Sequence, residues 1–389
     1  MGACLIAMSG RAAVADGTLT PYAAEDIEYN TNVFDIPSGS AAPLGKHGPT
    51  YADTFFEERA GVEGTYLIDQ ERFFGTAEFR RFDYQDLTEL SHNEELFDGG
   101  LKWKLSRLLD GTVEYRHEQR MVQFQDVTAS TSLILETENT ANLAFNVNVT
   151  PEWRLETAAK DHVLDSPRND VPGLSLHEDS VREGLRYLGV TNLSAGVDAG
   201  YLEGKYRNDP LALTPNYHQF SANLAAAYTV SGLTNFNGTL GYTKRVDPTN
   251  AGLSGITGSL GYLHSLSGKT SLSVLVNREL STYLTTGGNE IDTTASTSLN
   301  WQVTYKIGLK AGYGYTLSKY PENPDGALFI ERTDHFQTAN VEATYQVLHW
   351  LSIRPYARYQ TRHSNVPLNS FNSNMVGVEL LVKQFRPAR

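Results

Sequence analysis

The fold is decided by residues 54–84, which read TFFEERAGVEGTYLI, then DQE, then RFFGTAEFRRFDY. Within each long segment, apolar and polar side chains alternate with the two-residue period of a strand. In the first segment, Ala60, Val62, Tyr66 and Ile68 share one parity, and Glu57, Arg59, Glu63 and Thr65 share the other. Strands of soluble sandwiches are usually about 5–6 residues long, so alternating runs of this length predict a lipid-facing wall around a wet interior.

The composition of the whole chain fits such a closed sheet. Of the 389 residues, 40% are apolar, which is low for a helical membrane protein and normal for a barrel whose other face is wet. After the first dozen residues the sequence contains no run of about 20 apolar residues, so no helix is expected to span a bilayer. Only a closed sheet could cross a membrane.

The connections between the alternating segments give the strand count. The short connections lie near residues 69–71, 107–110, 151, 191–192, 231–232, 267–268, 305–306 and 348–349. The long, polar connections lie near residues 35–51, 85–92, 125–131, 165–176, 208–214, 247–252, 285–290, 321–331 and 364–371. Eight short turns and nine long loops predict an all-β fold, a single antiparallel transmembrane barrel of about 18 strands over residues 16–389, with both termini on the short-turn side.

Aromatic residues predict where the rims of this barrel lie, because Trp and Tyr prefer membrane–water interfaces. The four tryptophans, Trp103, Trp153, Trp301 and Trp350, all stand beside predicted short turns. The residues expected to form a second girdle, beside the long loops, are Tyr29, Tyr51, Tyr84, Tyr206, Tyr217, Tyr283 and Tyr320. The last strand, predicted over Met375 to Phe385, is expected to pair with the first and so remove the exposed edge.

Residues 1–15 are expected to form a signal peptide, cleaved after the small-x-small motif Ala13-Val14-Ala15. The basic n-region is missing, which indicates either a start codon placed too far downstream or an atypical leader. The alternatives are a disordered tail or a lipid anchor on Cys4. A secretory leader on a barrel predicts the outer membrane of a Gram-negative bacterium.

Several classes of function are disfavoured by the sequence. A net charge of -13 without a Lys/Arg run argues against nucleic acid as a partner. Cys4 is the only cysteine, the histidines show no HExxH spacing, and GxSxG is missing, so we expect no metal, no cofactor and no enzymatic activity. Residues 267–270, SGKT, lack the first glycine of a phosphate-binding loop, because position 263 is leucine.

The charged parity of the strands is the most informative functional feature. The candidate lumen-lining residues are Arg59, Glu63, Glu78, Arg80, Lys102, Arg116, Arg154, Arg354, Arg358 and Arg362. In the wider set of charged residues expected on this parity, thirteen bases slightly outnumber ten acids. Rings of charge set the selectivity of a pore, and cross-strand pairs such as Arg59 with Glu78 could equally hold a wet interior together.

The first third of the chain resembles the EpsL-like beta-barrel porin family of bacterial exopolysaccharide gene clusters. The resemblance is carried by Tyr29-Asn-Thr-Asn-Val-Phe34, the hairpin from Phe55 to Tyr84 and Gly99-Gly100-Leu101-Lys102-Trp103. Members commonly open with Tyr-Asp-Asp-Asn, and here Asn30 and Thr31 replace the two acids. The resemblance implies a barrel in outer-membrane lipid that exports a polysaccharide to the cell surface, together with a periplasmic polysaccharide export protein.

Two other functions remain open. The chain could be a diffusion porin for small solutes, or a surface adhesin or scaffold barrel whose long loops bind partners outside the cell.

Overall fold

The computed structural model describes residues 17–37, 39–122, 124, 132–166, 175–207, 216–247, 253–283, 288–320, 331–366 and 369–384. Strands dominate these residues, and the helical part is the single turn η1 (Thr88–Leu90). None of the described helices is long and apolar enough to cross a membrane. The leader expected at residues 1–15 and the chain from Phe385 onward lie outside the described residues.

Eighteen long antiparallel strands form one sheet. They are β1 (Gly17–Asn30), β4 (Asp53–Ile68), β5 (Glu71–Tyr84), β6 (His92–Lys104), β7 (Leu109–Met121), β8 (Leu135–Asn148), β9 (Trp153–Asp165), β10 (Ser175–Val190), β11 (Leu193–Arg207), β12 (Tyr217–Ser231), β13 (Thr234–Val246), β14 (Leu253–Ser267), β15 (Thr270–Tyr283), β16 (Gly288–Gln302), β17 (Ile307–Tyr320), β18 (Arg332–Leu348), β19 (Leu351–Ser364) and β20 (Phe371–Lys383). The two-residue strands β2 (Leu44–Gly45) and β3 (Gly48–Pro49) form a separate small hairpin in the first long connection.

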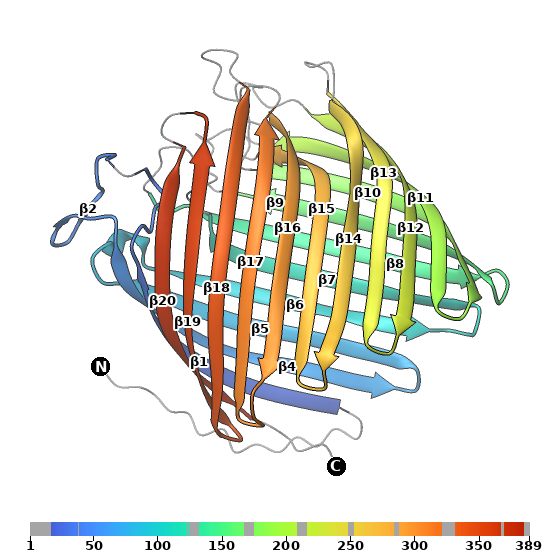
Figure 1. Cartoon of the computed structure of the whole chain (residues 1–389), viewed down its shortest axis with the longest axis horizontal. Helices are drawn as coiled ribbons and strands as arrows, with labels where there is room; N and C mark the ends of the chain where they lie inside the picture. The colour runs from blue at the N-terminus through green and yellow to red at the C-terminus, as the bar shows by residue number, and fades with distance from the viewer. Residues whose placement is uncertain are drawn as a thin grey trace.

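The sheet closes through β1, which pairs with β20 on one side and with β4 on the other. All other pairs join strands that follow each other in the sequence, as in β4 with β5 and β19 with β20. In Figure 1, β14–β20 cross the strands behind them at a steep angle, as expected of tilted strands in a closed barrel. The predicted 18-stranded barrel is confirmed.

The connections alternate as the sequence predicts. Two residues join β4 to β5, whereas residues 31–52 join β1 to β4. In outer-membrane barrels the short turns face the periplasm and the longer loops face the outside. This orients the barrel: the first residue of β1 and the last residue of β20 lie at the periplasmic end.

The outer face carries the apolar side chains. Leu224, Leu240 and Ile256 are about 60% exposed on β12, β13 and β14, with relative exposures of 61%, 60% and 62%. Such a band of exposed side chains is stable only against hydrocarbon. With the closed sheet, it places the protein in the outer membrane of a Gram-negative bacterium.

The aromatic residues agree with only one of the two predicted girdles. Trp103, Trp153 and Trp301 lie within two residues of the periplasmic ends of β6, β9 and β16, and Trp350 lies in the β18–β19 turn. The tyrosine girdle expected at the other rim was wrong in large part. Tyr29 faces outward, as a girdle requires, but Tyr51 lies in a loop, and the side chain of Tyr283 lies outside the described residues. Four others, on the inward parity, are Tyr84, Tyr206, Tyr217 and Tyr320. Proximity to a loop sets the height of a side chain, whereas its parity sets the face.

An apolar cluster ties the first three long loops together at the outer mouth. It consists of Val33, Phe34, Phe55, Tyr84, Leu87, Leu90 and Phe124. The carboxylate of Asp53 accepts hydrogen bonds from the backbone N–H of Asp86, at 3.0 Å, and of Leu87, at 2.7 Å. Because Phe55 and Tyr84 point inward, the described loop residues of this cluster pack against the inner side of the wall at β4 and β5.

The lipid-facing wall predicts how charges are tolerated at different depths. Val378→Arg places a charge in the middle of the outward face of β20, where it should cost about 2–4 kcal/mol, whereas the cost near an interface is about 0–1 kcal/mol. We expect Val378→Arg to reduce the yield of heat-modifiable folded protein far more than Trp153→Arg. Equal losses for the two variants would contradict the proposed depth of the tryptophan rim.

Candidate functional site

The inner face of the barrel is the candidate functional site, and all ten candidate lumen residues point into it. Their strands contribute them as follows: Arg59 and Glu63 from β4, Glu78 and Arg80 from β5, Lys102 from β6, Arg116 from β7, Arg154 from β9, and Arg354, Arg358 and Arg362 from β19. Each lies on the parity opposite to that of the exposed apolar side chains of its strand, apart from Leu67 at the periplasmic end of β4. The structure therefore gives these ten residues an inward position, and their role in a pore stays a prediction.

The charges on this face are unevenly distributed along the barrel axis. In the five strand residues nearest the periplasm, the inward-facing charges are Arg72, Lys102, Lys104, Arg154, Arg186, Lys310, Arg354 and Lys383, with Asp110, Glu156 and Glu379. In the five nearest the long loops they are Asp26, Glu28, Asp53, Glu57, Glu94, Glu118, Glu136, Glu138, Glu178, Glu279, Glu290, Asp292 and Asp334, with Arg80, Arg120, Arg245, Arg332 and Arg362. Between these ends lie Glu63, Glu78, Asp98, Glu114, Asp198 and Glu342, with Arg59, Arg116, Lys160, Arg182 and Arg358.

These sets correct the expected charge balance of the lumen. Among the described strand residues, 22 acids and 18 bases face inward, so acids and not bases are in excess. The acids that the sequence analysis missed lie mostly near the long loops, for example Asp26, Glu28 and Glu94. Residues 22–30 alternate as regularly as residues 54–68, so their parity would have placed Asp26 and Glu28 on the inner face.

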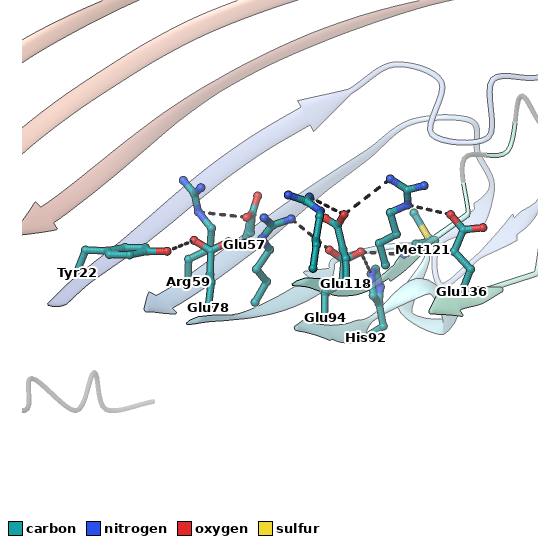
Figure 2. A network of polar contacts seen from close by, with 12 residues as sticks. Tyr22, Glu57, Arg59, Glu78, His92, Glu94, Glu118, Met121 and Glu136 are labelled. Atoms are coloured by element: carbon teal, nitrogen blue, oxygen red, sulfur yellow. Dashed lines mark hydrogen bonds and ion pairs between the residues drawn. The ribbon is translucent and has the colours of Figure 1, made fainter. Parts of the chain in front are cut away.

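A belt of alternating charges runs along the inner wall from β1 to β8 (Figure 2). The hydroxyl of Tyr22 donates to Glu78 at 2.6 Å, and Glu78 also accepts from Arg80 Nε at 2.5 Å. Arg80 Nη1 lies 3.6 Å from a carboxylate oxygen of Glu94, which in turn accepts from the backbone N–H of Met121 at 2.8 Å. Because these partners come from β1, β5, β6 and β7, the belt fixes neighbouring strands to one another across the wet face.

The belt continues over β7 to β12. Arg120 lies 2.8 Å from a carboxylate oxygen of Glu136 and 3.2 Å from one of Glu138. His162 lies between Glu138, at 3.2 Å, and Glu178, at 3.1 Å, and Glu178 accepts from the hydroxyl of Tyr217. One arginine and one histidine thus hold three glutamates together.

A second group joins the two ends of the chain at the β20–β1–β4 seam. Glu379 of β20 is bound by Arg59 of β4 and by Arg354 of β19, with Arg354 Nε 2.5 Å from its Oε1. The hydroxyl of Tyr356 lies 2.8 Å from Asp26 and 2.6 Å from Glu28, both of β1. The closure of the barrel is therefore secured by inward-facing side chains as well as by backbone hydrogen bonds.

Glycines make room for the tyrosines of this seam. A Cβ at Gly61 would lie 2.5 Å from Cζ of Tyr22, and a Cβ at Gly377 would lie 2.5 Å from Cζ of Tyr356. Each ring therefore lies flat over the bare backbone of the neighbouring strand. This position brings the hydroxyl of Tyr22 to Glu78 and that of Tyr356 to Asp26 and Glu28.

The opposite wall, formed by the inward-facing residues of β11–β17 and called here the neutral wall, is built mainly from Gly, Ala, Ser, Thr and Asn. Typical contacts are Thr243 with Thr257, 2.9 Å between hydroxyl oxygens, and Asn223 donating to Asp198 at 2.8 Å. By contrast, the wall from β18 through β1 to β10, the charged wall, carries most of the acids and bases. The lumen therefore has two chemically different sides.

One group with metal-ligand chemistry lies on the outer face. Asp161, His177 and Asp179 bring their ligand atoms within 4.8 Å of one another, near the long-loop ends of β9 and β10. Nε2 of His177 already lies 2.7 Å from Asp161, and Nδ1 of His177 lies 3.0 Å from Nη2 of Arg207. The group faces away from the lumen, and the neighbouring guanidinium supplies a positive charge to it.

Comparisons with known proteins bear on the fold. The sequence matches no protein-family profile and no curated protein. Solved structures do match: OpdQ of Pseudomonas aeruginosa has a TM-score of 0.51 and 11% identity, covering 96% of this chain and 100% of that one. OccK9 (OpdG) of Pseudomonas aeruginosa has a TM-score of 0.51 and 11% identity, covering 95% of this chain and 99% of that one. At these identities the likeness shows a common barrel fold.

The packing of Tyr22 over Gly61 can be tested by adding a methyl group. In Gly61→Ala the new Cβ meets both the Tyr22 ring and the backbone oxygen of Ala77, at 2.8 Å, so the ring must move and its bond to Glu78 is lost. Overpacking of this kind costs about 1–3 kcal/mol. The temperature at which the folded band disappears in heat-modifiability gels should fall.

The matched control is Gly75→Ala on β5, where the nearest atom to an added Cβ is 3.4 Å away. This variant should melt at the temperature of the unmodified protein. If Gly61→Ala melts there too, the tyrosine is not held by the glycine.

Proposed function

We propose that the protein is a diffusion porin for small polar solutes, a non-enzymatic channel of the outer membrane. The observation that carries this proposal is the inner face, where polar, charged and small residues predominate from the periplasmic end to the long-loop end in the strands that the structure describes, with a few apolar side chains such as Leu67 and Leu275 among them. A wet inner face inside an apolar outer face is the arrangement of a water-filled channel. The likeness to solved barrels supports the fold on which this proposal rests.

The chemistry of the two walls favours weak and unspecific contact with solutes. Most charges on the charged wall are already bound to one another, as in the Arg80–Glu78 and Arg120–Glu136 pairs. The neutral wall offers hydroxyl and amide groups that exchange hydrogen bonds with water easily. Weak, multiple contacts permit passage, since a tightly bound solute would leave the channel slowly.

Liposome swelling tests the proposal directly. Proteoliposomes diluted into isosmotic arabinose should swell, and the rate should fall progressively with glucose, sucrose and raffinose, because a diffusion pore discriminates by size. Empty liposomes and liposomes with heat-unfolded protein serve as controls. Absence of swelling in arabinose, with folded protein in the bilayer, would falsify the diffusion-porin proposal.

Three bases on β19 are proposed to favour anions inside the lumen. Arg354, Arg358 and Arg362 share the inward face at steps of four residues. Their field reaches about 8 Å at physiological ionic strength, so they act on ions already within the channel. Replacing all three with Gln should lower the chloride-to-potassium permeability ratio, measured as a reversal potential in a KCl gradient.

The control carries the same kind of change on the outer face. Lys244 and Lys319 lie on the outward parity of β13 and β17, and their Gln variants should leave the reversal potential unchanged. An unchanged ratio in the triple Arg variant would remove these three residues from the selectivity of the pore.

The neutral wall favours a second candidate function, the export of an exopolysaccharide. Its hydroxyl and amide groups can form weak, exchangeable hydrogen bonds with the hydroxyls of a sugar chain that moves past them. In that case the channel would receive the polymer from a periplasmic polysaccharide export protein. Deletion of the gene would then abolish the surface polymer while the synthesis enzymes remain active. Normal surface polymer in the deletion strain would contradict the export proposal. If arabinose also permeates in vitro, the diffusion porin remains as the proposed function.

A further inference from the structure

The inner face carries opposite net charges at its two ends. In the five strand residues nearest the periplasm, eight inward-facing bases oppose three acids, an excess of five positive charges. In the five nearest the long loops, thirteen acids oppose five arginines, a formal excess of eight negative charges, which becomes six when His92 and His162 are counted as positive. The segment between them is nearly balanced, with six acids and five bases. All of these counts concern the described strand residues.

Pairing within each end cannot remove this excess, since one sign outnumbers the other at both ends. Near the long loops, the hydroxyl of Tyr356 lies 2.8 Å from Asp26 and 2.6 Å from Glu28, so two carboxylates share one neutral group. Near the periplasm, Lys102 and Arg72 are directly paired across β5 and β6, where a base faces a base. Both ends therefore keep a net field that mobile ions must compensate.

We propose that the lumen is a bipolar pore that rectifies ion flow, with an acidic outer mouth that selects cations and a basic periplasmic end that selects anions. This inference rests on the proposed function, because it requires an open, water-filled channel. The determinants at the periplasmic end are Arg72, Lys102 and Lys104, and those at the outer end include Glu136, Glu279 and Asp292.

The direction of rectification follows from the order of the charges. Counter-ions collect at each end, so cations concentrate at the outer mouth and anions at the periplasmic end. When the extracellular side is positive, the field drives both populations toward the middle of the lumen, where they accumulate and carry a large current. With the opposite polarity both populations are drawn out, the middle is depleted, and the current is small.

Ionic strength controls this behaviour. The Debye length is about 10 Å at 0.1 M salt and about 3 Å at 1 M salt. At the lower concentration the fields of the wall charges reach across much of the channel, whereas at the higher concentration they stay close to the wall. Rectification should therefore be present at 0.1 M KCl and vanish at 1 M KCl.

Single-channel recording in planar bilayers tests the proposal on the full-length folded protein. The orientation of each channel is read from streptavidin, which binds a biotin attached at Lys46→Cys in the first long loop. At 0.1 M KCl we expect the current to be larger when the loop side is positive than at the same voltage of opposite sign. The ratio of the two currents should approach one at 1 M KCl.

Two charge variants and one control locate the effect. The triple change Arg72→Gln, Lys102→Gln and Lys104→Gln should bring the current ratio at 0.1 M KCl toward one. The change Glu136→Gln, Glu279→Gln and Asp292→Asn at the other end should do the same. Lys244→Gln with Lys319→Gln, on the outer face, should leave the ratio unchanged. Heat-modifiable migration establishes that each variant is folded.

The outcomes separate this inference from the proposed function. Equal currents at both polarities in 0.1 M KCl, or a larger current with the loop side negative, overturn the bipolar pore while arabinose swelling still upholds the porin. Full rectification in both folded lumen variants also overturns it. A folded protein that gives neither ion current nor swelling removes the proposed function and the inference together.

Discussion

The pairing of β1 with both β20 and β4 is the constraint on which the rest of the structure depends. In hydrocarbon an unpaired backbone N–H or C=O costs several kcal/mol, so a spanning sheet must have no edge. Closing the ring brings a strand from the start of the described chain against its last strand, Tyr22 opposite Lys383 and Asn30 opposite Met375. Every other pair joins sequence neighbours and forms locally, and only this seam needs contacts across the whole chain.

The side chains at the seam explain how so distant a pairing is made specific. Arg59, Glu379 and Arg354 come from β4, β20 and β19, so their ion pairs span β1 from one side to the other. The tyrosines Tyr22 and Tyr356 lie over glycines and reach carboxylates that a shifted register would move to the other face or out of range. A one-residue slip would also turn Asp26 and Glu28 toward lipid and away from the hydroxyl of Tyr356, which destabilises the barrel.

The predictions from the sequence were correct where they used the alternation of side chains and wrong where they used closeness to a loop instead. Parity placed Arg59, Glu78 and Arg354 on the inner face, and the rhythm of turns gave all eighteen strands. Tyr217 and Tyr320 were assigned to a lipid-facing girdle from their closeness to loops, although they share the inward parity of their strands; there they stack with Arg245, at 4.3 Å, and Arg332, at 4.5 Å. A list of charges could not show their axial segregation, because height depends on where each strand begins relative to its neighbours.

The separation of the two faces accounts for the coexistence of a stable barrel and an inner face with opposite charges at its two ends. Outside, the demand for apolar side chains is set by lipid and leaves little freedom at positions such as Val378. Inside, water screens and solvates the charges, so the protein tolerates excess acid at one end and excess base at the other at a modest cost in stability. Selection on transport can therefore change inward residues such as Lys102 or Glu279 without touching the residues that hold the barrel in the membrane.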